Sequence, residues 1–457
     1  MIQWTCPDCK RTARLNTGVR HHCACGKVVE SPAGPPAHPR PSRPASTASK
    51  AVCKHRGDQQ RLQWCDPCRG DIKVFACELY GECTLGKKLD GIACCNDRGV
   101  VCPDFTPSKG DHAIGTRVTG NGTLRIGFVT PSYTVPGGAE RWIHSVVSHR
   151  DSRVTWSGIA VTTNHHISHE LIAATPCPVA VGPAAIRAVA TRSDILVAWG
   201  LTNIRQNVIV DFPGRIAVIS HGCGEWTQAH LADESLRADD LRIGVSSAAA
   251  ASFPADVTTY VVHNGVDPSR VATTEDRETT RGRIGLAANE IAVGYVGRYS
   301  WEKNPLAAAQ AAAKLGASYR AVYVGDGWKR NEIVPKIKKL CPDAILVPNQ
   351  SHVGNMLAAL DCFVLASPSE GMSLAIIEAW MAGIPVVSTP VGAVPELELQ
   401  HGRLTTPVAI EPTAQQLATA VLRSLTAHDV TSRAKSVARR FLTSTAMATH
   451  LIDIFTR

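Results

Sequence analysis

The chain has 457 residues, of which 44% are hydrophobic and 19% are charged. This length exceeds what one hydrophobic core supports and predicts two large domains with smaller modules. The composition excludes a mostly disordered chain, and no apolar run reaches the roughly 20 residues of a membrane-spanning helix. The opening sequence MIQWTCPDCK lacks the apolar stretch of a signal peptide. We therefore expect a cytoplasmic protein, located in the host cytoplasm if the chain is viral.

The formal net charge of +9 lies mostly at the front of the chain. Residues 1–110 hold 17 Lys and Arg against 10 Asp and Glu, an excess of seven positive charges. A zinc ion bound by four thiolates carries a formal charge of about −2, so three such sites would cancel most of this excess. The basic composition alone therefore does not establish binding to nucleic acid.

Residues 1–30 are predicted to form a zinc-ribbon-like module. Four cysteines stand there in two closely spaced pairs: Cys6, Cys9, Cys23 and Cys25. Thiolates at this spacing are typical ligands of a tetrahedral structural zinc, with His21 and His22 as alternative ligands. Residues 31–50 are rich in Pro, Ser and Ala and predict a semi-extended linker.

Residues 51–110 are predicted to form a second cysteine-rich metal module. Its eight cysteines are Cys53, Cys65, Cys68, Cys77, Cys83, Cys94, Cys95 and Cys102. They suffice for two zinc sites or for ligation of an iron-sulfur cluster, and the sequence leaves both open. So small a region lacks a sufficient core, so bound metal should supply its folding energy, and we expect a structural role for the metal.

From residue 124 onward, short β-branched runs alternate with segments long enough for helices. The first set is LRIGFVT, VTWSGIAV, DILVAWG, RIAVISHG and TTYVVHNGV. After a polar connector a second set follows, namely IAVGYVG, RAVYVG, AILVPN, DCFVLAS and IPVVST. This pattern predicts α/β architecture with two tandem Rossmann-like domains, at residues 120–270 and 280–457, facing a cleft.

Three loops at predicted strand ends carry candidate binding residues. Gly137 and Gly138 open a helix, whose N–H groups suit a diphosphate, although a plain flexible turn is the commoner reading of two glycines. Arg298 and Lys303 follow the strand IAVGYV and could neutralise a leaving diphosphate. In isolation these two cations would equally suit a solvated loop.

The segment SPSEGMSLAIIEAWMAGIPVVST gives the strongest signal. Glu370 precedes a helix, and Glu378 lies within that helix, which Gly383 and Pro385 should end. The two carboxylates are spaced to reach hydroxyl groups of a sugar and of a ribose on the same ligand.

Together these pieces resemble the retaining glycosyltransferases of family 4, which have the GT-B fold. The resemblance rests on GGAE, ISHG, VVHNGVD, VGRYSWEKNP, YVGDGW and the two glutamates of EGMSLAIIE, in the family's order, and covers residues 124 to about 440. It implies a hexosyltransferase-like enzyme that uses a nucleotide-diphosphate sugar and retains the anomeric configuration. The Met of EGMS stands where many relatives have an aromatic residue, which leaves the transferred sugar open.

The resemblance also implies roles for individual residues. Arg298 and Lys303 would hold the donor diphosphate, and Glu378 would bind the ribose. The sugar and phosphates would contact Glu370 and the backbone of Met372, Ser373 and Leu374. His221 matches the histidine beside the reacting sugar. The chain has no Asp-x-Asp motif, so we expect no divalent metal at the donor site.

The acceptor is less defined by the sequence. Zinc ribbons commonly contact nucleic acid, and the front of the chain offers aromatic and cationic side chains: Trp4, Lys10, Arg11, Arg14, Arg20 and Trp64. A modified DNA base is therefore one candidate acceptor, beside a protein or a small molecule. The alternative function is a metal-containing nucleic-acid-binding protein with an inactive GT-B scaffold, and a phosphorylase or epimerase on this fold also stays open.

Overall fold

The computed structural model describes residues 122–457, apart from 135–136, 163–166, 210 and 351, and the backbone of seven short strands within residues 1–121. In the compact unit Met1–Lys54, β1 (Ile2–Thr5) pairs with β2 (Thr12–Leu15), and β3 (Arg20–His22) pairs with β4 (Val28–Glu30). In the unit His55–Arg457, a small antiparallel sheet comprises β5 (Gln63–Cys65), β6 (Gly70–Ala76) and β7 (Ile92–Cys95).

The cysteine ligands proposed for metal fall largely outside this description. Cys65, Cys94 and Cys95 lie in backbone strands whose side chains are not described. The other nine lie outside the described residues: Cys6, Cys9, Cys23, Cys25, Cys53, Cys68, Cys77, Cys83 and Cys102. The zinc and iron-sulfur assignments, the module boundaries and the nucleic-acid contacts of this region therefore stay predictions.

The first of two large parallel sheets forms what we call the first lobe, residues 124–261. Its strands run in the order β10-β9-β8-β11-β12-β13-β14. In chain order they are β8 (Leu124–Thr130), β9 (Val154–Val161), β10 (Val179–Val181), β11 (Ile195–Ala198), β12 (Arg215–Ser220), β13 (Leu241–Gly244) and β14 (Tyr260–Val261). The helices are α1 (Gly138–Val147), α2 (His169–Ala174), α3 (Pro183–Thr191), α4 (Glu225–Leu231), α5 (Ser247–Ala250) and a π-helical turn, Ile204–Val208.

The second large sheet, also parallel, forms the second lobe, residues 277–441. Its strand order is β17-β16-β15-β18-β19-β20. The strands are β15 (Ile291–Val296), β16 (Tyr319–Val324), β17 (Ile345–Val347), β18 (Cys362–Leu365), β19 (Val386–Ser388) and β20 (Thr406–Pro407). The helices are α6 (Arg277–Arg283), α7 (Leu306–Leu315), α8 (Arg330–Leu340), α9 (Gly354–Ala359), α10 (Leu374–Ala382), α11 (Val394–His401), α12 (Ala414–Thr426) and α13 (His428–Phe441).

This architecture confirms the two predicted parallel α/β domains. In both lobes the first strand in chain order lies beside the fourth, and the strands in between extend to one side of it. Ligands of such sheets bind beyond the carboxyl ends of the strands at this change of direction. A ligand is therefore expected to bind at the loops after β8, β11, β15 and β18.

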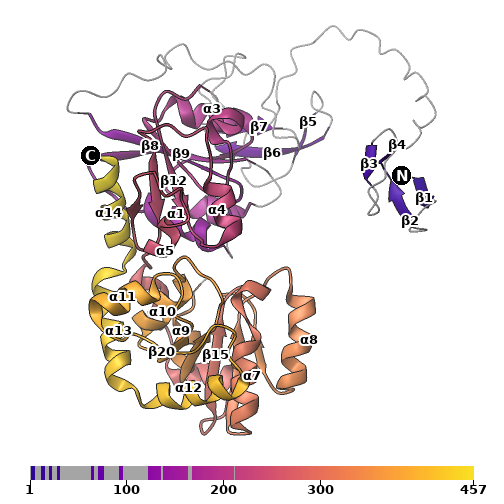
Figure 1. Cartoon of the computed structure of the whole chain (residues 1–457), viewed down its shortest axis with the longest axis vertical. Coiled ribbons are helices and arrows are strands. Elements are labelled where there is room, and N and C mark those ends of the chain that lie inside the picture. The colour runs from indigo at the N-terminus through magenta and orange to yellow at the C-terminus, as the bar shows by residue number, and fades with distance from the viewer. Residues whose placement is uncertain are drawn as a thin grey trace. The chain divides into compact units, whose positions relative to one another are not determined.

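The chain crosses between the lobes twice. Residues 262–276, which include the 3-10 helix Pro268–Val271, lead from the first lobe to the second, and α14 (Ser444–Phe455) returns to pack on α1 (Figure 1). The two crossings bond to each other, because the Val266 amide donates to the Leu442 carbonyl at 2.9 Å and the Ser444 amide donates to the Val266 carbonyl at 3.0 Å. The last helix is thus a structural part of the first lobe.

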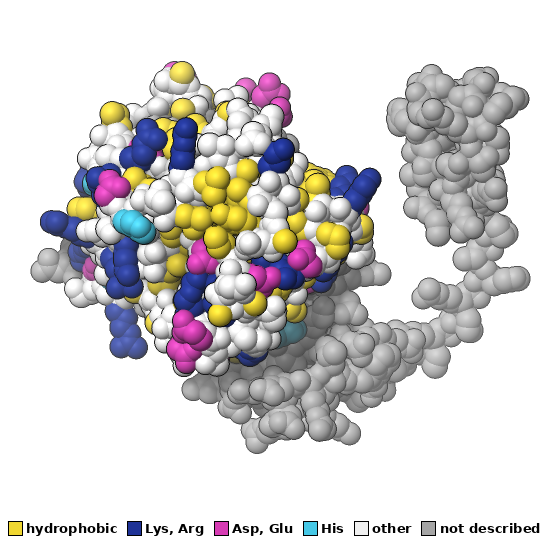
Figure 2. All heavy atoms as spheres, turned by 90° about the horizontal axis from the view of Figure 1, so that it is seen from below, with side chains coloured by type: hydrophobic (Ala, Val, Ile, Leu, Met, Phe, Trp, Pro, Cys, Tyr) yellow, Lys and Arg dark blue, Asp and Glu magenta, His cyan; other side chains and the backbone are white. Residues whose placement is uncertain are grey.

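The exposed large hydrophobic side chains of the described residues all belong to the second lobe: Trp301, Trp328, Leu340, Leu399, Ile410, Leu422 and Phe441. Figure 2 views the molecule from below and shows hydrophobic side chains gathered in a patch with Lys and Arg around it. No helix in the described ranges combines the length and hydropathy needed to cross a bilayer.

Candidate functional site

A cleft of about 390 Å³ lies between the two lobes. It brings together all the residues that the sequence proposed for catalysis and donor binding: Gly137, Gly138, His221, Arg298, Lys303, Glu370, Met372, Ser373, Leu374 and Glu378. The fold explains this convergence, because the residues follow strand ends of two facing sheets. Their individual roles stay predictions.

Lys303 and Glu370 form an ion pair on the second-lobe side of the cleft. The Lys303 Nζ lies 2.6 Å from Oε2 of Glu370, which is 8% exposed. The other carboxylate oxygen, Oε1, accepts a hydrogen bond from the Ser367 hydroxyl at 2.8 Å. Lys303 comes from the loop after β15 and Glu370 from the loop after β18, and these strands are neighbours in the sheet. Each charge is therefore held in place before any ligand binds.

Arg298 follows β15 and lies partly open to solvent. Its Nη2 donates to Glu302 Oε1 at 3.1 Å, and its guanidinium carbon lies 4.5 Å from the ring centre of Trp328. An arginine held against an indole face keeps its charge while losing freedom of movement. The geometry suits a guanidinium that binds an anion at the edge of the cleft.

Glu378 lies on α10 and is only 2% exposed. The helix begins after Ser373, whose hydroxyl accepts from the Ile376 amide, and it ends at Gly383 in a left-handed conformation with φ of 80°. Glu378 Oε1 accepts a charged hydrogen bond from Arg270 and lies 4.0 Å from Arg141. Burial, and secondarily the nearby charge of Arg270, lower the pKa of Arg141 to about 10.

Asn264 ties the crossing segment to the second lobe. Its Nδ2 donates to the Met372 carbonyl at 2.8 Å, and its backbone amide lies 3.0 Å from the Met372 sulfur. The VVHNGVD motif thus fixes the loop that carries the predicted sugar contacts. Its asparagine was part of a quoted motif but received no role from the sequence.

His221 follows β12 on the first-lobe side, and its Nε2 atom is shielded from solvent. Its ring meets Trp142 and Trp199 edge to face, at centroid distances of 5.2 and 5.8 Å. Burial lowers the pKa of His221 to about 4, so the ring is neutral at physiological pH. Among the described residues nothing lies within hydrogen-bonding distance of its Nε2.

The start of α1 is occupied by a carboxylate. Gly137 is the N-cap and has no side chain to serve as a cap, and Glu140 sits three residues later. A Cβ added at Gly137 would stand 1.6 Å from Glu140 Oε2, while Oε1 accepts from the Ser132 hydroxyl at 2.5 Å. Glu140 is 5% exposed, and burial raises its pKa above the ordinary value. Sequence reasoning missed it, because an acidic third residue of a helix usually indicates a simple cap.

The lobes touch directly beside the cleft. A Cβ added at Gly371 would stand 2.3 Å from the His221 carbonyl, so only glycine fits against the first lobe there. The Cys223 thiol also donates to the Glu370 carbonyl at 2.9 Å. The loop that carries Glu370 is therefore positioned by contacts from both lobes.

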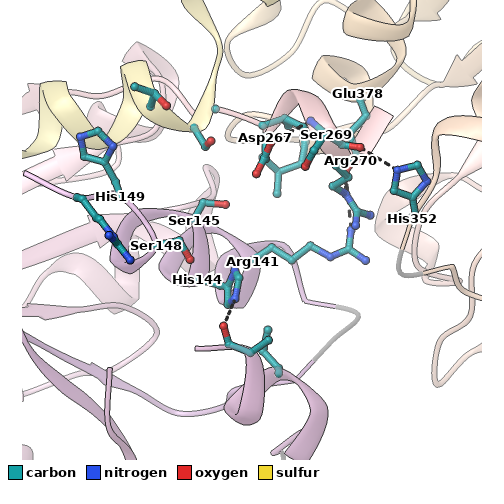
Figure 3. Close-up of a pocket in the computed structure, with 18 of the residues that line it drawn as sticks. Arg141, His144, Ser145, Ser148, His149, Asp267, Ser269, Arg270, His352 and Glu378 are labelled. Carbon is teal, nitrogen blue, oxygen red and sulfur yellow. Dashed lines mark hydrogen bonds and ion pairs between the residues drawn. The ribbon is translucent and has the colours of Figure 1, made fainter. Parts of the chain in front are cut away.

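A second cavity, of about 520 Å³, borders the cleft (Figure 3). It shares Arg141, Arg270, Leu374 and Glu378 with the cleft. Figure 3 shows Arg141 reaching from the first lobe toward Arg270, with Glu378 on the far side. These three side chains form the wall between the two spaces, and Arg141 and Arg270 were not singled out by the sequence.

Comparison with known proteins agrees with this geometry. Residues 290–427, within the second lobe, match the family described as glycosyl transferases group 1. The teichuronic acid biosynthesis glycosyltransferase TuaC of Bacillus subtilis is 37% identical over 161 residues, which cover 35% of this chain and 39% of that protein. The N-acetyl-alpha-D-glucosaminyl L-malate synthase of Bacillus anthracis is 30% identical over 31% of this chain and 38% of its own. The matches thus span about two fifths of these relatives' length.

Solved structures match over more of the chain. Anabaena Alr3699/HepE, determined with UDP and glucose, superposes with a TM-score of 0.62 at 19% identity, covering 73% of this chain and 99% of that one. WaaG, a glycosyltransferase involved in lipopolysaccharide biosynthesis, gives a TM-score of 0.55 at 15% identity, covering 72% and 99%. At these identities the likeness establishes the fold, which is the predicted GT-B arrangement.

Proposed function

We propose that the protein is a retaining glycosyltransferase that moves a hexosyl group from a nucleotide-diphosphate sugar to an acceptor. The observation that carries the proposal is the cleft itself, in which buried, ion-paired charges of the second lobe face a neutral, enclosed histidine of the first. The glycosyl transferases group 1 match at residues 290–427 and the UDP and glucose of the HepE structure support a nucleotide-sugar donor.

The charged residues suggest how the donor is held. Arg298 and Lys303 would neutralise the diphosphate as its bond to the sugar breaks, which stabilises the transition state. Glu378 would give up part of its contact with Arg270 and bind the ribose hydroxyls instead. Glu370 would contact the sugar. The backbone of Met372, Ser373 and Leu374 would complete the contacts to sugar and phosphates.

Retention of configuration is part of the proposal and follows the resemblance to family 4. Glu370 carries the Lys303 ion pair, which makes it a poor nucleophile. We therefore propose a same-face reaction assisted by the leaving phosphate, with His221 beside the reacting sugar. Two cations at the diphosphate position supply the charge that a divalent ion supplies elsewhere, so turnover should persist in a chelator.

The acceptor is proposed to be a macromolecule, with a modified DNA base as the first candidate. The cysteine modules would select it, and zinc, or zinc with an iron-sulfur cluster, would fold them. Deletion of residues 1–110 should leave donor hydrolysis intact and abolish transfer. Binding of the full chain to DNA should weaken steeply with salt, and salt-independent or absent binding would redirect the search to proteins and small molecules.

The alternative, an inactive scaffold that binds nucleic acid, is disfavoured by the buried charges. Glu370 and Glu378 are 8% and 2% exposed. Burying a charge costs free energy, and an inactive scaffold would have no need of these buried charged groups. The experiment that decides is a screen of nucleotide sugars for release of free nucleoside diphosphate. Release from one donor supports the enzyme, whereas none from any donor, in protein that still binds DNA, supports the scaffold.

A further inference from the structure

Glu140 differs from the other buried acids of the cleft. Glu370 is paired with Lys303, and Glu378 is paired with Arg270. Glu140 also lines the cleft, yet within the described part of the chain it has no ion-pair partner. The neutral Ser132 hydroxyl donates a hydrogen bond to Glu140 Oε1 at 2.5 Å, and a backbone hydrogen bond also contributes.

The backbone is shaped to hold this carboxylate in the cleft. Glu140 Oε2 occupies the space that a side chain at residue 137 would need, at 1.6 Å from an ideal Cβ. Glu140 is 5% exposed, so its carboxylate is largely withdrawn from bulk water at the first-lobe wall of the cleft.

The other buried titratable groups of the cleft are poor proton acceptors. Burial holds the pKa of His221 at about 4, which makes its ring a weak base. The Lys303 and Arg270 ion pairs tie up the remaining buried carboxylates. Burial instead raises the pKa of Glu140, and the Ser132 hydrogen bond and the charges of Arg298 and Arg141 oppose this only in part.

We propose that Glu140 is a catalytic residue that takes the proton of the acceptor hydroxyl. The inference rests on the proposed glycosyl transfer. As the acceptor oxygen bonds to the anomeric carbon, the bond from that carbon to the diphosphate oxygen breaks, and the electron pair leaves with the diphosphate. The leaving phosphate assists by taking this electron pair, while the hydroxyl proton passes to the Glu140 carboxylate and then to solvent, so atoms and charge balance.

The test needs no knowledge of the natural acceptor, because water serves as one. The full chain is assayed for diphosphate release from UDP-glucose, or from whichever nucleotide sugar the wild type hydrolyses in the screen. Glu140→Gln keeps the shape and the Ser132 contact but cannot accept a proton. We expect kcat to fall about 100-fold, within the usual range for general-base catalysis, while the affinity for UDP changes less than about twofold. Glu234→Gln, at an exposed acid of the first lobe, should match the wild type.

The pH profile separates proton transfer from a structural role. The wild-type kcat should rise with pH as Glu140 deprotonates, which gives the pH profile an acid limb. Glu140→Gln should lose this limb. Ser132→Ala removes a hydrogen bond that lowers the Glu140 pKa, so it should shift the limb to higher pH. A Gln variant within about threefold of the wild type, or one that keeps the limb, overturns the proposal. A wild type that hydrolyses no nucleotide sugar overturns the proposed function instead, and the Glu140 role with it.

Discussion

The two lobes share a strand order but bring different chemistry to the cleft. At the centre of the second lobe, the loops after β15 and β18 supply Lys303 and Glu370 as a buried ion pair. In the first lobe, the segments after the equivalent strands β8 and β11 instead supply Trp142 and Trp199, whose rings pack against the neutral ring of His221 after β12. Equivalent strands therefore lead to charged groups in one lobe and to an aromatic enclosure in the other. The proposed reaction would use both, since charges act most strongly in surroundings of low polarity.

Removing charge from the second lobe should have the largest effect. In the proposed role, Lys303→Ala would take a cation from the diphosphate, and it leaves Glu370 buried without its partner, so we expect kcat to fall about 100- to 1,000-fold. Steady-state kinetics on the hydrolysed nucleotide sugar measures this, with Lys336→Ala on the exposed side of α8 as the control. An unchanged kcat with only a raised KM would contradict a transition-state role.

The complementary change is to add a charge to the first lobe, by protonating His221 at low pH. The unfolded chain protonates a histidine near pH 6.5, whereas buried His221 binds a proton only near pH 4. The unfolded state thus holds more protons between these values, and stability falls as pH drops through this range, by roughly 3 kcal/mol from this group.

Urea unfolding at several pH values checks this dependence on acid. His221→Phe should flatten the loss of stability between pH 6.5 and pH 4, while His169→Phe, at an exposed position, should keep the wild-type slope. Equal slopes in the wild type and His221→Phe would show that the ring is not buried neutral.

Glu378 lies where the two lobes' charges meet, and its loss should act on binding. If Glu378 binds the ribose as proposed, Glu378→Ala leaves the ribose hydroxyls unpaired, so nucleotide affinity should weaken by about 1 to 3 kcal/mol. Calorimetry with UDP measures the change, and a melting curve checks that Arg270 and Arg141, left facing each other, do not unfold the protein. Unchanged affinity in a folded variant would remove the ribose assignment.

The smallest effect is expected where the lobes touch. Gly371→Ala places a methyl group 2.3 Å from the His221 carbonyl, and the clash should cost about 1 to 2 kcal/mol or separate the lobes locally. Gly282→Ala, whose added methyl group meets nothing within 4 Å, is the matched control. Thermal unfolding compares the two, and equal melting temperatures would mean that the contact is not formed in solution.

Much of the fold could be predicted from hydrophobic runs. LRIGFVT and VTWSGIAV coincide with β8 and β9, and Gly383 ends α10 as expected. The sequence analysis did not identify β10, β13 and β20, which have three, four and two residues.

The site was less predictable because convergence is a property of the folded chain. Arg298, Lys303 and Glu378 were identified through motifs of one lobe. Glu140 stood in the motif GGAE but received no role, and Arg270 gave no such signal, since an acid in a first helical turn and an arginine in a connecting segment are common on surfaces. Folding makes Glu140 a buried group and Arg270 a half-buried group of the cleft.

The paired crossings between the lobes have a mechanical consequence. Two segments far apart in sequence run side by side at Val266 and Thr443 and are joined by backbone hydrogen bonds. Sliding one lobe along the other, or pulling them apart, would break these bonds, whereas rotation about the line of the crossings would preserve them. Rotation about this line is therefore the opening motion that would leave the backbone hydrogen bonds of both crossings intact.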